Sequence, residues 1–166
     1  MFYPDKIYKR IYNVPLRELF SLGIRGLILD IDNTLTLHNS PDIDALTKAW
    51  LKEAEEIGFK LMILSNNKKE RVAPFAKSLN IDFVANGGKP LLFGAKKCKE
   101  KLGIGNSQLA FIGDQIFTDV LCAKRFGSLS ILLEPIQKEK FLFFRLKRYI
   151  EKLILKNYKE KKGERR

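Results

Sequence analysis

Short apolar runs that alternate with helical segments constrain the fold of this chain more than any other feature. The apolar runs lie at residues 26–30, 60–65, 83–85, 109–112 and 129–133. Segments with helical periodicity separate them, at residues 42–57, 68–79, 90–102 and 116–126. Continuous apolar strands between helices are typical of βαβ units, in which helices cover both faces of a parallel sheet. The sequence therefore predicts an α/β protein with a three-layer, doubly wound, mostly parallel Rossmann-like sheet.

The positive charge of the chain is concentrated at its two ends. The net charge is +12 over 166 residues, a length that suits one domain. Residues 138–166 hold 12 basic and 4 acidic side chains, residues 1–25 hold 5 and 2, and residues 26–137 hold 14 and 13. We predict one domain at 1–137, with a basic lead-in, and a basic amphipathic helix and tail at 138–166. A near-neutral body argues against a nucleic-acid-binding module, so nucleic acid is not an expected partner.

Cysteine usage and the N-terminal sequence bear on the cellular compartment. Cys98 and Cys122 fall in expected helices, without the spacing of a zinc site or a disulfide framework. Residues 1–12 lack the apolar core of a signal peptide, and every apolar run is far shorter than the roughly 18 residues of a membrane span. We expect a cytoplasmic protein that the basic C-terminal segment could attach to the inner face of the cell membrane.

Polar side chains follow the expected strands at the point where each strand ends. In open parallel sheets, ligands bind beyond the carboxyl ends of the strands, so these side chains are candidates for one site. In chain order they are Asp30, Asp32, Ser65, Asn66, Lys89, Asp114 and Asp119. Acids, a hydroxyl group and a lysine at one edge suit phosphoryl transfer, because they can hold a cation, orient a phosphate and offset its charge.

The spacing of Asp30 and Asp32 indicates a metal ion. Carboxylates this close repel each other unless a cation lies between them or one of them holds a proton. Mg²⁺ prefers a few carboxylate ligands together with several waters, so it fits this pair. A calcium loop does not fit, because Leu35 stands where that loop needs glycine and Pro41 stands where it needs glutamate.

The order of these motifs resembles the haloacid dehalogenase (HAD) superfamily of phosphatases. The chain has Asp-x-Asp-x-Thr at 30–34, then Ser65, then Lys89, then Gly-Asp-x-x-x-x-Asp at 113–119. Each motif alone is weak, but all of them occur in order and each lies at an expected strand end. The resemblance implies a Mg²⁺-dependent phosphatase with a Rossmann-like fold.

The resemblance also implies roles for individual residues. Asp30 would be the nucleophile that forms an aspartyl-phosphate. Asp32 would be the general acid for the leaving group and then the base that activates water. Asp30, Asp114 and the backbone carbonyl of Asp32 would bind Mg²⁺.

The remaining motif residues would surround the phosphate. Ser65 would hydrogen-bond the phosphoryl group, and Lys89 would offset the charge of the phosphate and of Asp30. Thr34 would support the turn that orients the acids, and we group it with the phosphate-binding residues. Asp119 would support the metal or Lys89. The position of Asn66 directly after Ser65 suggests a contact with the phosphate or with the backbone.

The spacing between motifs leaves no room for a cap domain. Asp30 and Ser65 are 35 positions apart, and Ser65 and Lys89 are 24 apart. An uncapped site is open, which suits a large substrate or one presented on a surface. The opening Tyr-Pro-Asp at 3–5 and the Asp-Ile-Asp-Asn-Thr-Leu motif are similar to the capless HAD-IIIA branch of bacterial proteins related to phosphatidylglycerophosphate phosphatases, which act in phospholipid synthesis.

The segment 141–158 predicts an amphipathic helix. On a helical wheel, its apolar side chains fall within an arc of about 140°. They are Leu142, Phe143, Leu146, Tyr149, Ile150, Leu153 and Ile154. This arc could lie in an anionic membrane surface, pack on the domain, or contact a second copy of the chain in a homo-oligomer. The basic residues that flank the arc suit the membrane surface, and a lipid substrate also favours this alternative.

Three functions remain open on the sequence alone. The leading one is hydrolysis of a lipid phosphate, as in phosphatidylglycerophosphate phosphatases. The second is the same chemistry on a nucleotide, a sugar phosphate or a phosphoprotein. The third is a non-enzymatic RNA-binding or ribosome-binding module, against which the intact Asp30 and Asp32 argue. His38, the single histidine, either contacts substrate or is merely solvated.

Overall fold

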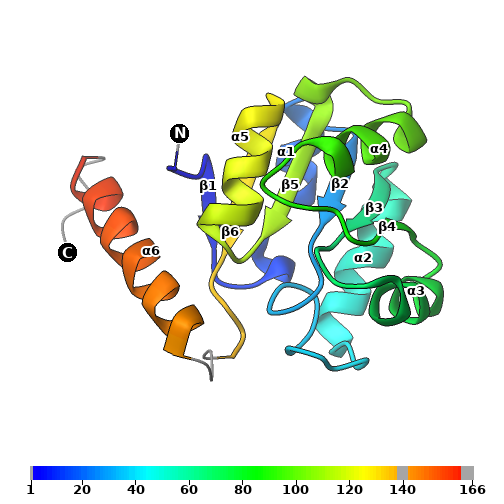
Figure 1. The fold of residues 1–166 in the computed structure, drawn as a ribbon. Helices are drawn as coiled ribbons and strands as arrows, with labels where there is room; N and C mark the ends of the chain where they lie inside the picture. The colour runs from blue at the N-terminus through cyan, green and yellow to red at the C-terminus, as the bar shows by residue number, and fades with distance from the viewer. Residues whose placement is uncertain (1, 138–141, 162–166) are drawn as a thin grey trace.

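A parallel six-stranded sheet forms the centre of the computed structural model, which describes residues 2–137 and 142–161. The strand order is β1-β6-β5-β2-β3-β4, and every neighbouring pair is parallel (Figure 1). The strands are β1 (Lys6–Tyr8), β2 (Gly26–Leu29), β3 (Lys60–Leu64), β4 (Asp82–Val84), β5 (Leu109–Gly113) and β6 (Leu129–Leu133). This arrangement confirms the predicted doubly wound sheet.

The edge strand β1 differs from the sequence-based expectation. No strand was predicted before residue 26, and the first α-helix of the chain is α1 (Leu16–Ser21), which follows Pro15 and a short 3₁₀ helix. β1 is too short for its alternation to be read from sequence, and it pairs with β6 at the edge. The Asp5 carboxylate fastens this edge by accepting hydrogen bonds from the Ser130 backbone N–H (2.8 Å) and hydroxyl (2.7 Å).

Helices cover both faces of the sheet. They are α2 (Ala45–Ile57), α3 (Lys69–Ser78), α4 (Phe93–Leu102) and α5 (Leu121–Phe126), with a π-helical turn η3 (Ile116–Val120) and a 3₁₀ turn η2 (Asn106–Gln108). The prediction that Pro90 opens the helix ending at Leu102 is wrong. The Lys89–Pro90 peptide bond is cis, and the Leu91 N–H donates to the Gly88 carbonyl in a turn that precedes α4.

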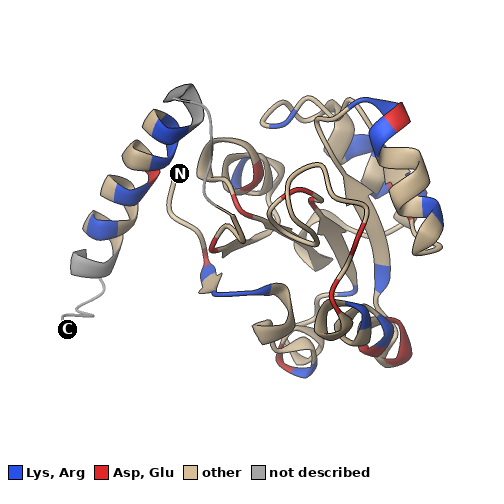
Figure 2. Ribbon diagram, turned by 90° about the horizontal axis from the view of Figure 1, so that it is seen from below, with Lys and Arg blue, Asp and Glu red and all other residues tan. Residues whose placement is uncertain are grey.

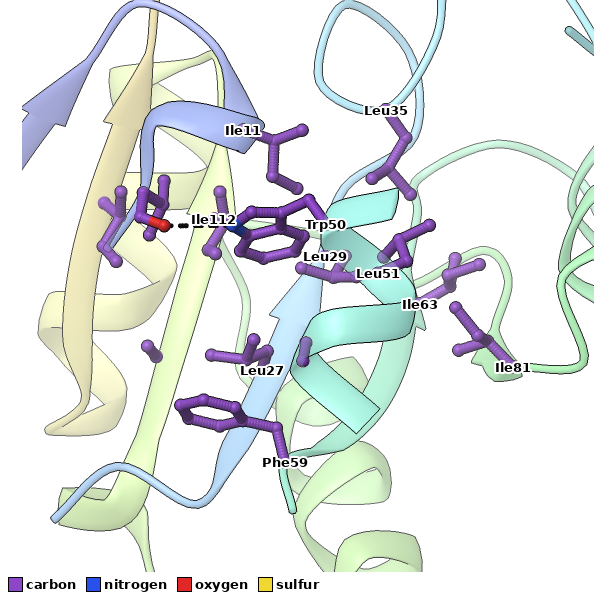
Figure 3. Packing of buried hydrophobic residues seen from close by; sticks show 14 of the residues in the cluster. Ile11, Leu27, Leu29, Leu35, Trp50, Leu51, Phe59, Ile63, Ile81 and Ile112 are labelled. Atoms are coloured by element: carbon purple, nitrogen blue, oxygen red, sulfur yellow. Dashed lines mark hydrogen bonds between the residues drawn. The ribbon is translucent and has the colours of Figure 1, made fainter. Parts of the chain in front are cut away.

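Two apolar clusters lie on opposite faces of the sheet. Leu27, Leu29 and Ile63 point to the face covered by α1, α2 and α3, where Trp50 of α2 donates its indole N–H to the Val14 carbonyl at 3.0 Å (Figure 3). Ile28, Met62 and Phe111 point to the face covered by α4 and α5.

Both cysteines belong to the second cluster. Burial raises the pKa of Cys98 to about 12 and that of Cys122 to about 11, so both thiols stay protonated and pack as small apolar groups.

Single helices connect the central strands. Between β2 and β3 the chain forms one loop and α2, and between β3 and β4 it forms only α3. Neither connection contains a cap domain, as the spacing predicted. The carboxyl ends of the strands are therefore reached without crossing an additional domain.

The C-terminal helix α6 (Leu142–Lys161) lies beside the β1 edge of the sheet (Figure 1). Ile154 and Leu155 pack against Ile116, Val120 and Leu132, and Glu151 is buried. No helix within residues 2–137 and 142–161 is long and apolar enough to cross a membrane.

The predicted apolar arc of α6 mostly faces away from the domain. Leu146, Tyr149, Ile150 and Leu153 are 43–59% exposed, so the alternative in which this arc packs on the domain is wrong for these four residues. The side chains of Leu142 and Phe143 lie outside the described part of the chain. The contacts of α6 with the domain edge include polar ones, in which Glu151 accepts from the Ile116 N–H and Arg148 pairs with Asp114.

Candidate active site

The site is built where three neighbouring strands end. Asp30 follows β2, Ser65 follows β3 and Asp114 follows β5, and these strands lie side by side in the sheet. The Asp30 backbone N–H donates to the Ile112 carbonyl of β5 at 3.0 Å, which continues the ladder up to the first acid. Parallel pairing therefore brings residues that are far apart in the sequence to one edge.

Three carboxylates converge at this edge. Asp30, Asp114 and Asp119 each offer an oxygen, and these oxygens lie within 4.8 Å of one another. Asp114 is 2% exposed, and its Oδ1 atom has no hydrogen-bond partner among the described residues. Burying a carboxylate oxygen without a partner is costly, and hard divalent cations take oxygen ligands. The cluster therefore fits a divalent cation, whereas the Asp32 carboxylate lies outside it.

Lys89 bridges two of these acids. Its Nζ atom lies 2.7 Å from Asp30 Oδ1 and 2.6 Å from Asp119 Oδ1, and its side chain is 4% exposed. Burial lowers the pKa of Lys89, but the charges of Asp119 and Asp30 outweigh this and raise it above its ordinary value. The ammonium group therefore stays charged and neutralises part of the acidic cluster.

Asn66 holds the backbone of Lys89. Its Nδ2 donates to the Lys89 carbonyl at 2.9 Å, and its Oδ1 accepts from the Lys89 N–H at 2.7 Å. Both ends of the amide are thus engaged with the loop. Of the two contacts that the sequence suggested for Asn66, phosphate or backbone, the structure places the side chain on the backbone.

Two acids of the cluster, Asp30 and Asp114, are harder to ionise than ordinary carboxylic acids. Burial, with the charges of Asp119 and Asp32, raises the pKa of Asp30 to about 6, although Lys89 opposes this. Burial also raises the pKa of Asp114 well above its ordinary value, against the opposing charge of Arg148. A divalent cation would favour the charged forms of both groups.

Gly113 makes room for Asp119. A Cβ atom at position 113 would overlap the Asp119 carboxylate, so the strand can approach this acid only with glycine. Asp119 Oδ2 accepts from the Gln115 N–H at 3.1 Å, and the π-helical turn η3 carries the side chain back toward Lys89. The glycine of the Gly-Asp motif is thus required by packing.

Three hydrogen-bond donors orient the Asp32 carboxylate. Its Oδ1 accepts from the Asn39 N–H at 2.8 Å and from Arg71 Nη2 at 3.0 Å, and its Oδ2 accepts from Asn67 Nδ2. Arg71 also donates to the Ser40 carbonyl at 2.8 Å, so α3 ties the loop after β2 to this acid. Sequence reasoning missed Arg71, because a helix-borne arginine lacks a strand-end signature.

The two hydroxyl residues of the motifs are both buried. Ser65 is 2% exposed, and its Oγ accepts from the Asn67 N–H at 3.1 Å, which leaves its O–H as a donor. Thr34 is also 2% exposed, and its Oγ1 has no partner among the described residues. His38 is exposed on the loop that follows.

Arg148 of α6 reaches the acidic cluster. Its guanidinium group pairs with Asp114 Oδ2 and also donates to the Asp114 carbonyl. Glu151 Oε2 accepts from Arg148 at 3.1 Å, while its Oε1 accepts from the Ile116 N–H at 2.8 Å. Arg148 thus engages one oxygen of Asp114 and leaves Oδ1 directed elsewhere. This contact depends on the docking of α6 and has no signature in the local sequence.

Comparisons with known proteins agree with this geometry. Residues 46–127 match the family model of haloacid dehalogenase-like hydrolases. A protein of Bacillus subtilis (strain 168) described as probable phosphatase YqeG is 32% identical over 160 residues, which cover 96% of this chain and 93% of that protein. The chain belongs to the haloacid dehalogenase-like hydrolases. The prediction of a phosphatase is confirmed.

Two further similarities concern this hydrolase. Phosphatidylglycerophosphate phosphatase 1 of Chlamydomonas reinhardtii, a chloroplast protein, is 26% identical over 135 residues, or 76% of this chain, and the chain spans half of that relative. A crystal structure of an uncharacterized protein from Listeria monocytogenes serotype 4b superposes with a TM-score of 0.58 at 22% identity, covering 71% of this chain and 85% of that one. The latter likeness concerns the fold. HAD hydrolases typically use a divalent metal ion, and the acidic cluster can hold one.

Proposed function

We propose that this hydrolase is a Mg²⁺-dependent phosphomonoesterase that acts on a lipid phosphate of the phosphatidylglycerophosphate type. The observation that carries the chemistry is the convergence of Asp30, Asp114 and Asp119 around an unpartnered carboxylate oxygen, with Lys89 beside them. Relatives named as phosphatidylglycerophosphate phosphatases support the substrate class.

The first half of the reaction transfers the phosphoryl group to Asp30. A carboxylate oxygen of Asp30 attacks phosphorus and forms an O–P bond, while the bond between phosphorus and the leaving alcohol oxygen breaks. Asp32 gives a proton to that oxygen, so the alcohol leaves neutral. Lys89, at 2.7 Å from Asp30, offsets charge on the attacking group and on the phosphate.

The second half returns the enzyme to its starting state. Asp32, now a carboxylate, accepts a proton from water as the water oxygen attacks phosphorus. The bond between phosphorus and Asp30 breaks, and inorganic phosphate leaves. Asn67 and Arg71 hold Asp32 in place throughout, and the Ser65 hydroxyl donates to a phosphoryl oxygen.

Asp30, Asp114 and the Asp32 carbonyl would bind Mg²⁺, with Asp119 supporting the cluster through Lys89. When bound, Mg²⁺ supplies positive charge that stabilises the phosphoryl oxygens in the transition state. The carboxylate oxygens of Asp30, Asp114 and Asp119 lie within 4.8 Å of one another in the structure, so the strand ends already bring these groups together.

The outer face of α6 supports a membrane location for the substrate. Leu146, Tyr149, Ile150 and Leu153 form an exposed apolar strip, and the basic side chains of Arg145, Lys152 and Lys156 run along it. Figure 2 shows Lys and Arg recurring along this helix. An apolar strip flanked by basic residues suits the surface of an anionic bilayer, where apolar burial and charge attraction act together.

A phosphate-release screen tests the proposed function. We expect the protein with Mg²⁺ to release phosphate from phosphatidylglycerophosphate in mixed micelles at a kcat/KM at least about tenfold above that for nucleotides, sugar phosphates or phosphopeptides. EDTA should abolish the release, and Mg²⁺ should restore it. A preference for a soluble phosphate would overturn the proposed lipid substrate. Phosphate release that EDTA leaves unchanged would overturn the proposed dependence on Mg²⁺.

Liposome flotation tests the strip on α6. We expect recovery with phosphatidylglycerol vesicles to fall several-fold in the triple variant Leu146→Gln, Ile150→Gln, Leu153→Gln, because buried apolar area is lost. Leu22→Gln with Leu46→Gln is the matched control, since both residues are exposed elsewhere on the domain.

Equal recovery of the triple variant, the control variant and the wild type would reject membrane binding through this strip. A dimer that the triple variant dissociates would assign the strip to a second copy of the chain. A salt-sensitive complex with RNA that needs the basic side chains would favour the nucleic-acid reading.

A further inference from the structure

A cavity of about 710 Å³ lies between α6 and the β1–β6 edge of the sheet. Asp114 of the acidic cluster is among its lining residues, so the cavity reaches the metal-ligand edge of the active site. Its volume lies within the range of roughly 300–1,000 Å³ that is typical of small-molecule sites. The proposed reaction at Asp30 leaves the cavity unexplained.

The two walls of the cavity differ in chemistry. The sheet edge contributes the apolar residues Ile7 and Leu132, whereas α6 contributes Arg145 and Lys152. Arg148 and Glu151 also line it, but they are engaged with Asp114 and with each other. Glu134 is exposed at the rim.

The cavity and the outer strip of α6 share one residue. Tyr149 belongs both to the cavity lining and to the exposed apolar strip, with 59% of its surface exposed. Arg145 and Lys152 are also exposed while lining the cavity. A molecule whose apolar end lies along the strip can therefore extend its polar end past two cations toward Asp114.

We propose that this cavity binds the leaving-group part of the substrate, namely a glycerol phosphodiester together with the first methylene groups of its acyl chains. Arg145 and Lys152 pair with the phosphodiester, and the apolar wall formed by Ile7 and Leu132 receives the chains. The inference rests on the proposed function, because it names where the second phosphate of a two-phosphate lipid is recognised.

A binding measurement without turnover tests the cavity. Dihexanoylphosphatidylglycerol, used below its micellar concentration, carries the phosphodiester and short chains but no scissile phosphate. We expect calorimetry with the full-length protein and Mg²⁺ to give a Kd at least about tenfold weaker for Arg145→Gln with Lys152→Gln than for wild type. Lys96→Gln with Lys99→Gln on α4 removes the same charge outside the lining and should match wild type.

Kinetics give a second readout on the same variants. The Arg145→Gln, Lys152→Gln double variant should raise KM for phosphatidylglycerophosphate about tenfold and leave kcat/KM for p-nitrophenyl phosphate unchanged, because the latter has no second phosphate. Both residues are exposed, so the variant is expected to fold.

The outcomes separate this inference from the proposed function. Unchanged binding of dihexanoylphosphatidylglycerol in the double variant, or equal binding of dihexanoylphosphatidylcholine, would overturn the role of the two cations. Equally tight binding of glycerophosphoglycerol, which lacks chains, would overturn the role of the apolar wall. Charge-dependent binding without phosphate release from phosphatidylglycerophosphate would keep the cavity and reject the proposed substrate.

Discussion

Replacing Asp30 by asparagine is expected to lower kcat for phosphate release by at least about 10³-fold. The amide keeps the size of the side chain but cannot form the aspartyl-phosphate. It also removes the charge that Lys89 contacts at 2.7 Å and one oxygen donor of the acidic cluster. Steady-state phosphate release with phosphatidylglycerophosphate and with p-nitrophenyl phosphate measures the loss.

A trapping experiment distinguishes the nucleophile from a mere metal ligand. Acid quenching of wild type with ³²P-labelled substrate should yield a phosphoenzyme that hydroxylamine cleaves, and Asp30→Asn should yield none. Asp114→Asn serves as the comparison, because it weakens the cluster without removing the attacking oxygen. Asp82→Asn, on the exposed pair with Lys101, should retain full activity. Labelled phosphoenzyme in Asp30→Asn would transfer the nucleophile role to another residue.

The central strands and the acids at their ends could be predicted because both depend on local sequence. A buried parallel strand is a continuous apolar run, and the polar residue that follows it marks the end. β1 could not be predicted in this way, since a strand of three residues is too short to show an alternation of apolar and polar side chains. Its attachment to the sheet edge depends on Asp5. The start of α4 could not be predicted either, because a turn between Gly88 and Leu91 precedes the helix, which begins at Phe93.

The arginines of the site could not be predicted, because their contacts arise from tertiary packing. Arg71 lies on α3 and Arg148 lies on α6, each 34 or more residues from its acid. The docking of α6 also departs from the expectation that a whole apolar face packs on a domain, because Ile154 packs there while Leu146 and Leu153 stay exposed. The N–H of Ile116 at the start of η3 and the carboxylate of Asp114 are buried and need partners, which Glu151 and Arg148 supply.

Replacing Lys89 by methionine is expected to destabilise the Mg²⁺-free protein by about 3–5 kcal/mol, the usual cost of removing one partner from a buried ion pair. The variant keeps the length of the side chain but leaves Asp30 and Asp119 facing each other without the ammonium group. Urea unfolding in EDTA measures the loss. Lys101→Met is the matched control, because its pair with Asp82 has side chains 47% and 55% exposed and should contribute less than about 1 kcal/mol.

The same variant separates the structural role of Lys89 from its role in catalysis. Mg²⁺ should restore part of the lost stability, because a cation at the cluster offsets the same carboxylates, whereas Lys101→Met should gain no more from Mg²⁺ than wild type. Adding Asp119→Asn to Lys89→Met removes one of the two opposed charges and should also recover stability. Neither change returns the positive charge beside the phosphate, so activity should stay low in both. Recovery of activity along with stability would show that Lys89 acts only in folding, and a loss no larger than that of Lys101→Met would contradict the buried bridge.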